Sequence, residues 1–189
     1  MGDADIRGRA PDPKGPVIMR QTLVASVALG LLACGGGGSS APPPVESIVR
    51  NDRSADIGRA MLKQRGDRIQ VQIRLTGLKP GRHGMHLHAT PLCQGPGFTT
   101  AGSHLNPGGM KHGRLNPQGH HLGDLPNLDV DKNGKADATV DVTGPEAAKG
   151  LKAFLGRGMA LVIHADPDDE KTDPTGSSGA RVACAAFKP

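Results

Sequence analysis

The most informative chemistry in this sequence is a group of histidines, which begins with two that stand two residues apart. In the stretch GMHLHATPLC, residues 84–93, His86 and His88 precede Cys93. On an extended strand the side chains at positions i and i+2 point to the same face, so both imidazoles could reach one metal ion. A lone His-x-His pair is a weak signal, because histidines also pack in cores and lie on surfaces.

Further metal-binding side chains follow the pair, in a glycine- and proline-rich stretch and at the end of a later apolar run. Zinc binds about four ligands in a tetrahedral arrangement, and a mixture of imidazole and carboxylate suits it. Copper also favours imidazole, and it ranks highest in affinity among the divalent ions. The sequence therefore predicts two ligand sets, one on a strand and one in a loop, drawn from His86, His88, His104, His112, His120, His121, Asp124 and His164.

The elements that must position these side chains are predicted to be short strands. Residues 67–78 (DRIQVQIRLTGL) and 135–144 (KADATVDVTG) alternate apolar and polar residues, which is typical of strands with one buried face. Residues 158–166 (GMALVIHAD) form a short apolar run, and only residues 144–154 have helical character. Short strands separated by turn signals indicate an antiparallel sandwich or barrel. The long loop over residues 89–129 needs something to order it, and metal is the candidate.

One acidic stretch resembles a calcium-binding loop but is predicted to be a turn. DVDKNGKADATV, residues 129–140, has Val140 at its twelfth position, where such a loop needs glutamate. The Asp-Lys-Asn-Gly segment favours a tight turn between two strands instead.

Composition and charge limit the classes of function. With 189 residues, 36% of them hydrophobic, the chain is long enough for one domain with a sizeable core. Its aromatic residues are Phe98, Phe154 and Phe187, and no run of lysine and arginine is interleaved with them. Nucleic-acid binding is therefore disfavoured. A formal charge of +5 suits the attraction of a small anion.

The first 44 residues predict export and attachment to a membrane. Residues 1–33 are interpreted as a signal peptide, in which Arg20 precedes a short apolar run, and Met19 is the suspected true start because residues 1–18 fit poorly. Leu-Leu-Ala-Cys resembles the end of a bacterial lipoprotein signal, after which Cys34 would carry lipid; an ordinary thiol is the alternative. Residues 34–44 would be the lipidated cysteine and a flexible linker, and residues 45–189 the domain. We therefore expect the protein in the bacterial cell envelope.

The chain has three cysteines, and this number predicts one disulfide. If Cys34 is lipidated, Cys93 and Cys184 are left to pair in an oxidising compartment. The bond would close a long loop, which is worth about 4 to 5 kcal/mol in the chain-entropy model.

Taken together, the motifs resemble those of the copper,zinc superoxide dismutases. They occur in the family's order and approximate spacing over about residues 45–188. The resemblance implies an all-β fold, an eight-stranded Greek-key β-barrel or sandwich with long metal-binding and guiding loops. It also implies copper and zinc cofactors and the conversion of superoxide to dioxygen and hydrogen peroxide. The motifs are PGRHGMHLH (80–88), AGSHLNP (101–107), KHG (111–113), HLGDLPNLDVDKNGKA (121–136), LVIHADPDD (161–169) and GARVAC (179–184).

The resemblance also assigns the ligands. His104 would bridge the two metals and pass a proton to the product. The family's His-x-Gly-Asp pattern selects His121 over its neighbour His120, which would be exposed. The implied copper ligands are His86, His88, His104 and His164, and the implied zinc ligands are His104, His112, His121 and Asp124.

Five further positions match the family outside the ligand sets. Asp168 would link copper- and zinc-binding imidazoles through hydrogen bonds, and His83 would serve packing. Arg181 would be the catalytic arginine that attracts superoxide. Cys93 and Cys184 match the family's disulfide.

Two questions stay open in the sequence. The short segment between His164 and Arg181 resembles bacterial members and leaves the charge pattern of the guiding loop undefined. The choice between a monomer and a homodimer is also open, because the chain lacks the tyrosine and tryptophan that often build dimer contacts. The alternative function is a non-catalytic zinc- or copper-binding envelope protein on the same fold, which the complete ligand set argues against.

Overall fold

The structure is a computed structural model that describes residues 41–156 and 158–189. The predicted signal peptide, the predicted lipidation site Cys34 and the linker up to residue 40 lie outside the described residues. Within the described ranges, no helix is both long enough and apolar enough to cross a membrane.

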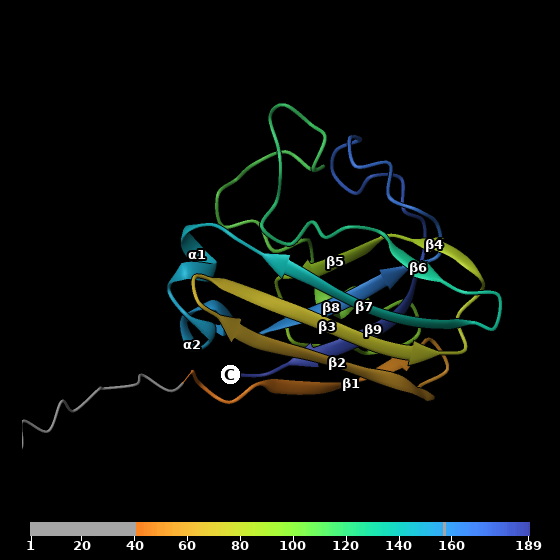
Figure 1. The fold of residues 1–189 in the computed structure, drawn as a ribbon. Coiled ribbons are helices and arrows are strands. Elements are labelled where there is room, and N and C mark those ends of the chain that lie inside the picture. The colour runs from red at the N-terminus through yellow and green to blue at the C-terminus, as the bar shows by residue number, and fades with distance from the viewer. Residues whose placement is uncertain (1–40, 157) are drawn as a thin grey trace, which may run out of the picture. The chain divides into compact units, whose positions relative to one another are not determined.

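The described residues form a curled antiparallel β-structure of nine strands, with two short helices at one end (Figure 1). Seven strands make one sheet in the order β5-β8-β9-β1-β2-β3-β7, and β4 pairs with β6 in a second. The bounds are β1 Val45–Asn51, β2 Asp56–Arg65, β3 Arg68–Thr76, β4 Gly81–His83, β5 Met85–His88, β6 Leu128–Val130, β7 Lys135–Val142, β8 Met159–His164 and β9 Arg181–Phe187, with α1 Pro145–Ala148, α2 Leu151–Leu155 and the 3-10 turn η1 Thr99–Ala101.

The strand order is that of the predicted Greek-key barrel. After β3 the chain leaves the meander, and β3 pairs with β7 rather than with β4. β4 and β5 are one bent strand interrupted at Gly84, whose N–H donates to Asp166 O and whose carbonyl accepts from His164 N. Counted as one, they give the eight strands predicted, and the bend lets this strand pair with β6 at one end and β8 at the other.

The core follows from the alternation of the strands. In β3, Ile69, Val71, Ile73 and Leu75 are buried, and the residues between them face outwards. β8 is buried on both faces, which explains its unbroken apolar run. Alternate residues of β8 point into the main core, and the others pack in a second cluster of Phe98, Ala101, Ala160, Val162 and Cys184, with Cys93 at its edge.

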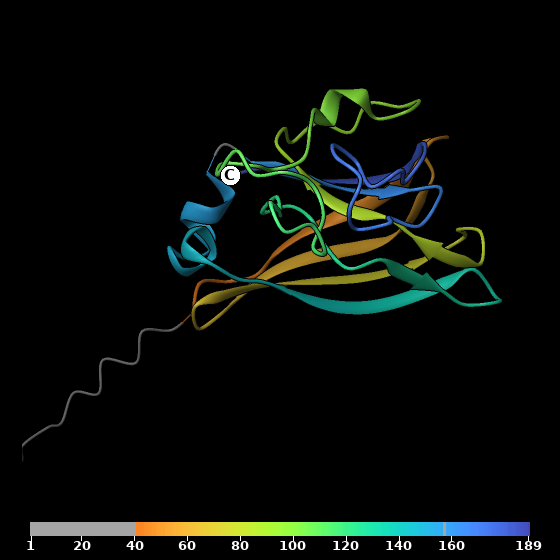
Figure 2. The same ribbon diagram turned by 90° about the horizontal axis from the view of Figure 1, so that it is seen from above.

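A disulfide fixes the first long loop, residues 89–127, and an ion pair joins this loop to the second, residues 165–180. Cys93 in the first loop is bonded to Cys184 in β9, so the predicted pairing is confirmed. The loop over residues 104–124 and the loop over residues 165–180 lie together above the barrel (Figures 1 and 2), joined by Lys111 and Asp173 at 3.0 Å. The predicted tight turn is also present, because Asp131 Oδ1 accepts from the main-chain N–H groups of Asn133 and Lys135.

The first prediction concerns the core that supports both loops. Ile73→Ala should lower the free energy of unfolding of the metal-free protein by about 2–5 kcal/mol, because it leaves a cavity at a fully buried position of β3. Leu115, at the tip of a loop, is 63% exposed. Leu115→Ala should therefore change that free energy by no more than about 0.5 kcal/mol in the same denaturant titration. Equal effects of the two substitutions would contradict the placement of the core.

Candidate metal centre

The predicted ligands come from two strands and one loop, and main-chain pairing holds the loop against the strand. His86 and His88 lie in β5, and His164 ends β8. Bridge-like pairings join His86 to Asp124 and His88 to His104, and Leu87 N donates to Gly123 O. The close approach needs glycine at position 123, because a Cβ there would collide with the carbonyl oxygen of Leu87. The loop ligands therefore reach the face of β5 through local backbone structure.

The four predicted zinc ligands place their side-chain ligand atoms close together. Asp124 Oδ1 lies 3.0 Å from Nδ1 of His104, 3.0 Å from Nδ1 of His112 and 3.2 Å from Nδ1 of His121. The Nδ1 atoms of His104 and His121 are 3.2 Å apart. Zinc bonds of 2.0–2.1 Å arranged tetrahedrally give edges of about 3.3 Å between ligand atoms. These four distances match the edges of such a tetrahedron, and main-chain N–H groups of Gly113 and His121 fix the other carboxylate oxygen, Asp124 Oδ2.

A second set of nitrogen atoms is buried without hydrogen-bond partners. Ligand atoms of the four predicted copper ligands lie within 4.8 Å of one another. In the part of the chain that the structure describes, five buried side-chain polar atoms lack a partner, and four of them belong to this set. Buried polar groups are nearly always paired, so four orphaned imidazole nitrogens in one place indicate a cation between them. The atoms are His86 Nδ1, His88 Nε2, His104 Nε2 and His164 Nε2.

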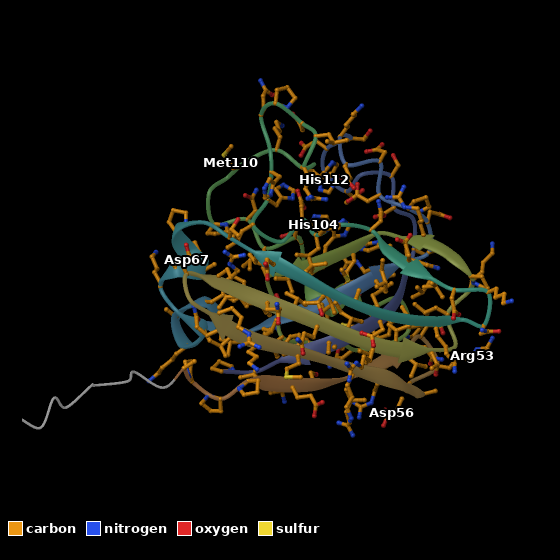
Figure 3. All side chains as sticks on the ribbon, viewed as in Figure 1. Arg53, Asp56, Asp67, His104, Met110 and His112 are labelled. Carbon is orange, nitrogen blue, oxygen red and sulfur yellow. A yellow bond between two sulfur atoms is a disulfide. The ribbon has the colours of Figure 1, made fainter. Side chains whose placement is uncertain are left out.

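His104 belongs to both sets through its two ring nitrogens. Its Nδ1 faces the tetrahedral set and its Nε2 faces the orphaned set. Figure 3 shows His104 and His112 close together, above the strands and below the loops. The two clusters therefore share one imidazole ring.

The opposite nitrogens of the other three rings are held by hydrogen bonds. His88 Nδ1 donates to Gly102 O at 2.8 Å and His164 Nδ1 donates to Gly179 O at 3.1 Å. His86 Nε2 lies 2.6 Å from Asp168 Oδ2. Each bond places the proton on the outer nitrogen, so the lone pair of the inner nitrogen points into the cluster.

Asp168 connects the two clusters from the side. Its Oδ1 lies 3.1 Å from His112 Nε2, so one carboxylate contacts a ring from each set. Asn127 clamps the backbone of Asp168, since Asn127 Oδ1 accepts from Asp168 N at 2.7 Å and Asn127 Nδ2 donates to Asp168 O at 2.9 Å. Sequence reasoning found Asp168 but missed Asn127, which gave no signal beyond its place in the motif of residues 121–136.

Electrostatics favour neutral imidazoles in the orphaned set. Burial lowers the pKa of His86 to about 4, of His164 to about 3 and of His88 to about 2. All three rings are therefore uncharged at neutral pH, the state in which imidazole binds metal.

In the tetrahedral set, burial has less effect on the pKa values of His112 and Asp124 than hydrogen bonds and nearby charges have together. Burial lowers the pKa of His112, but hydrogen bonds to Asp124 and Asp168 outweigh it and raise the pKa to about 9. Burial alone would raise the pKa of Asp124, yet hydrogen bonds from His104 and His112 hold it well below the usual range. Asp124 thus stays ionised, and a metal ion that binds His112 must displace a proton.

Arg181 lies beside the orphaned set and is anchored to the first loop. Its Nη1 donates to Phe98 O at 2.9 Å and its Nη2 donates to Gly102 O at 2.7 Å. Gly102 O is also the acceptor for His88, so one carbonyl positions both side chains. Arg181 pairs in register with His164 across β8 and β9, which keeps its positive charge near the cluster.

Two histidines lie outside both clusters. His83 places Nδ1 2.6 Å from His164 O and Nε2 2.8 Å from Lys79 O, which is a packing role behind the strand end. His120 is exposed, and its Nδ1 lies 2.6 Å from the carbonyl oxygen of His121. The structure therefore brings His121, not His120, to the tetrahedral set.

Comparison with known proteins agrees with this geometry. The family described as copper/zinc superoxide dismutase (SODC) matches residues 57–187. The chain belongs to this family. A copper/zinc superoxide dismutase of Aquifex aeolicus is 39% identical over 143 residues, which cover 73% of this chain and 83% of the relative. The family uses copper and zinc, and the two clusters are the places where this member could hold them.

The fold is also similar to that of solved structures. A SOD-like protein from Bacillus subtilis has a TM-score of 0.70 and 36% identity, covering 75% of this chain and 97% of its own. The Cu/Zn superoxide dismutase from Brucella abortus has a TM-score of 0.62 and 26% identity, covering 77% of this chain and 100% of its own. Those chains contain little beyond the matched domain, so in them the fold forms without an added segment as long as residues 1–40.

The second prediction tests the link between the clusters. Asp168→Asn should weaken the binding of both copper and zinc about 10–100-fold, because a carboxylate that orients ligating imidazoles is lost from both sets. Competition with a chelator measures the two affinities, and Asp129→Asn, at an exposed position in β6, is the matched control. Unchanged affinity in Asp168→Asn would contradict the role of this contact.

Proposed function

We propose that the protein is an active superoxide dismutase of the bacterial cell envelope. Two superoxide anions and two protons would give one dioxygen and one hydrogen peroxide. The observation that carries the proposal is the set of four buried, unpartnered imidazole nitrogens beside an anchored arginine. Membership of the copper/zinc superoxide dismutase family supports the reaction, and the chain's own residues support the site.

The proposed copper site consists of the four orphaned nitrogens, and the proposed zinc site of the tetrahedral set. His104 would bridge them, with Nε2 on copper and Nδ1 on zinc. When bound, copper supplies a one-electron redox couple and zinc a fixed positive charge without redox change. The copper ligands would be His86, His88, His104 and His164, and the zinc ligands His104, His112, His121 and Asp124.

The protein's own groups handle the anion and the protons. The Arg181 guanidinium attracts superoxide and orients it next to the orphaned nitrogens, because two main-chain carbonyls hold the side chain in place. Among the described residues His104 Nε2 has no hydrogen-bond partner, so whenever this nitrogen is not a ligand it could hold a proton and donate it to the reduced oxygen species. Asp168 keeps the rings of His86 and His112 oriented throughout.

The proposed location rests on the N-terminal sequence. The lipoprotein-like ending before Cys34 supports a membrane anchor, and residues 34–44 would be the linker. The Cys93–Cys184 disulfide supports an oxidising compartment. Superoxide is the proposed substrate, and protection against oxidants outside the cytoplasm is the proposed role.

A non-catalytic metal-binding protein on the same fold is the second candidate. It is favoured by the similarity to a Bacillus subtilis protein described only as SOD-like. The complete set of four nitrogens and Arg181 favours catalysis, because storage of zinc or copper needs no anion-attracting group beside the site.

The third prediction decides between these candidates. Purified protein loaded with copper and zinc should dismutate superoxide, and removal of copper by a chelator should abolish the activity. His86→Ala should lower the activity at least about 100-fold, since it removes one copper nitrogen. His120→Ala, the exposed neighbour of the zinc set, should keep the parent activity. Activity that survives both copper removal and His86→Ala would rule out the proposed centre, and inactive metal-loaded protein would favour storage.

The fourth prediction concerns Arg181. The rate constant kcat/KM should fall as ionic strength rises, because salt screens the attraction between Arg181 and the anion. Arg181→Gln should lower kcat/KM about tenfold at low salt and flatten its salt dependence.

Two control variants separate charge from structure. Arg181→Lys should keep much of the salt dependence, and Lys132→Gln, in the turn between β6 and β7, should change neither quantity. If the rate of Arg181→Gln depended on salt as steeply as that of the parent, the arginine would not steer superoxide.

A further inference from the structure

One end of the barrel gathers the segments that enter and leave the domain. We call it the linker pole, and it consists of residues 45, 62–69, 141–156 and 187–189. Val45 pairs with Leu62, and Ile69 pairs with Val142, so the start of β1 lies at the same end as the β2–β3 turn. α1 and α2 and the C-terminus lie there as well (Figure 1).

The linker pole carries an excess of positive charge. It has six basic and three acidic side chains, a net charge of 6 − 3 = +3. The acidic ones are all in ion pairs, since Arg68 lies 3.1 Å from Asp141 and 3.8 Å from Asp67, and Lys149 lies 2.7 Å from Glu146. The remaining cations, which form no ion pair among the described residues, are Lys63, Arg65, Lys152 and Lys188.

The rest of the described domain does not combine free cations with acidic side chains that are all in ion pairs. The opposite pole, formed by the turns at residues 52–55, 77–80 and 131–134, also has cations outside ion pairs, namely Arg53, Lys79 and Lys132. The carboxylates of Asp52 and Asp131 there form no ion pair within the described ranges either. The loop over residues 165–180 is acidic, with Asp166, Asp168, Asp169, Glu170 and Asp173 against Lys171. The linker pole is thus the end of the described domain at which no unpaired side-chain carboxylate offsets the free cations.

We propose that the linker pole docks on the anionic headgroups of phospholipids. This inference rests on the proposed membrane anchor at Cys34, because residues 34–44 join that anchor to Val45. The flexible linker predicted from the composition of this segment would have a root-mean-square span of about 20 Å, which would keep the pole next to the membrane at a high effective concentration. Each Lys or Arg close to an anionic surface strengthens binding roughly fivefold.

The linker pole has exposed cations but no exposed large apolar side chain among its described residues, so its contact with lipid would be electrostatic and would not insert into the bilayer. The exposed large apolar side chains of the described residues are Leu92, Met110 and Leu115, and all three lie in the long loops instead. The docked domain should therefore be released by salt, since ions screen the surface potential within about 8 Å at physiological ionic strength. The two ligand clusters lie beneath the long loops, where Figure 3 shows His104 and His112 away from Asp67 of the pole. Docking at the pole would therefore leave the long loops uncovered.

The experiment uses residues 41–189, which lack Cys34, so that its outcome does not depend on lipidation. Binding to vesicles of phosphatidylcholine with 30% phosphatidylglycerol is compared with binding to pure phosphatidylcholine, at low salt and at 0.5 M NaCl. The pole variant is Lys63→Gln/Lys152→Gln/Lys188→Gln. The matched control is Arg53→Gln/Lys79→Gln/Lys132→Gln, which removes the same charge from the opposite pole. Thermal unfolding and superoxide dismutase activity check that both variants are folded.

The proposal expects binding to the anionic vesicles alone, a loss on the order of 100-fold in the pole variant, a much smaller loss in the control, and release at 0.5 M NaCl. Equal losses in the two variants, no binding by the parent domain, or binding to anionic peptidoglycan fragments instead of vesicles would overturn it. Failure of the proposed anchor is detected separately, by mass spectrometry of Cys34 in the membrane fraction, and failure of the proposed catalysis by the activity assay.

Discussion

The structure depends on a local conflict between burial and hydrogen bonding. Four imidazole nitrogens point at one another in the interior, and no group of residues 41–156 or 158–189 forms a hydrogen bond with them. Each buried polar atom left without a partner costs about 1–3 kcal/mol, so this arrangement is unfavourable by itself. A cation bound at the four lone pairs removes the conflict. The same ion would then stabilise the loop that brings His104 to the strand.

The barrel and its disulfide hold the four imidazole rings in place, although their inner nitrogens have no hydrogen-bond partner among the described residues. β5 sends His86 and His88 to one face by simple alternation, and β8 ends at His164 where its register with β9 shifts. The disulfide between Cys93 and Cys184 fixes the first loop, whose carbonyls at Phe98 and Gly102 hold Arg181. The ligands, the orienting acceptors and the arginine therefore come from elements that cannot move independently.

The sequence was sufficient to predict those features of the fold and of the site that depend on side-chain type. Alternation in residues 67–78 and 135–144 predicted β3 and β7, and the resemblance of the histidine motifs to those of the family predicted which rings would meet. It could not predict the partners that belong to the main chain, such as the Gly102 carbonyl, because any residue presents that group. Asn127 was missed for a similar reason, since its role depends on a backbone contact 41 positions away in the chain. The interruption of the β4–β5 strand at Gly84 likewise depends on its pairing with two different strands.

The central claim is that His104 shares its two ring nitrogens between two metal ions. Anomalous diffraction at the copper and zinc absorption edges, on crystals of protein loaded with both metals, tests it most directly. The account predicts a copper peak beside His104 Nε2 and a zinc peak beside His104 Nδ1, on opposite sides of one ring. A single mixed peak, or a copper peak away from His104, would contradict it.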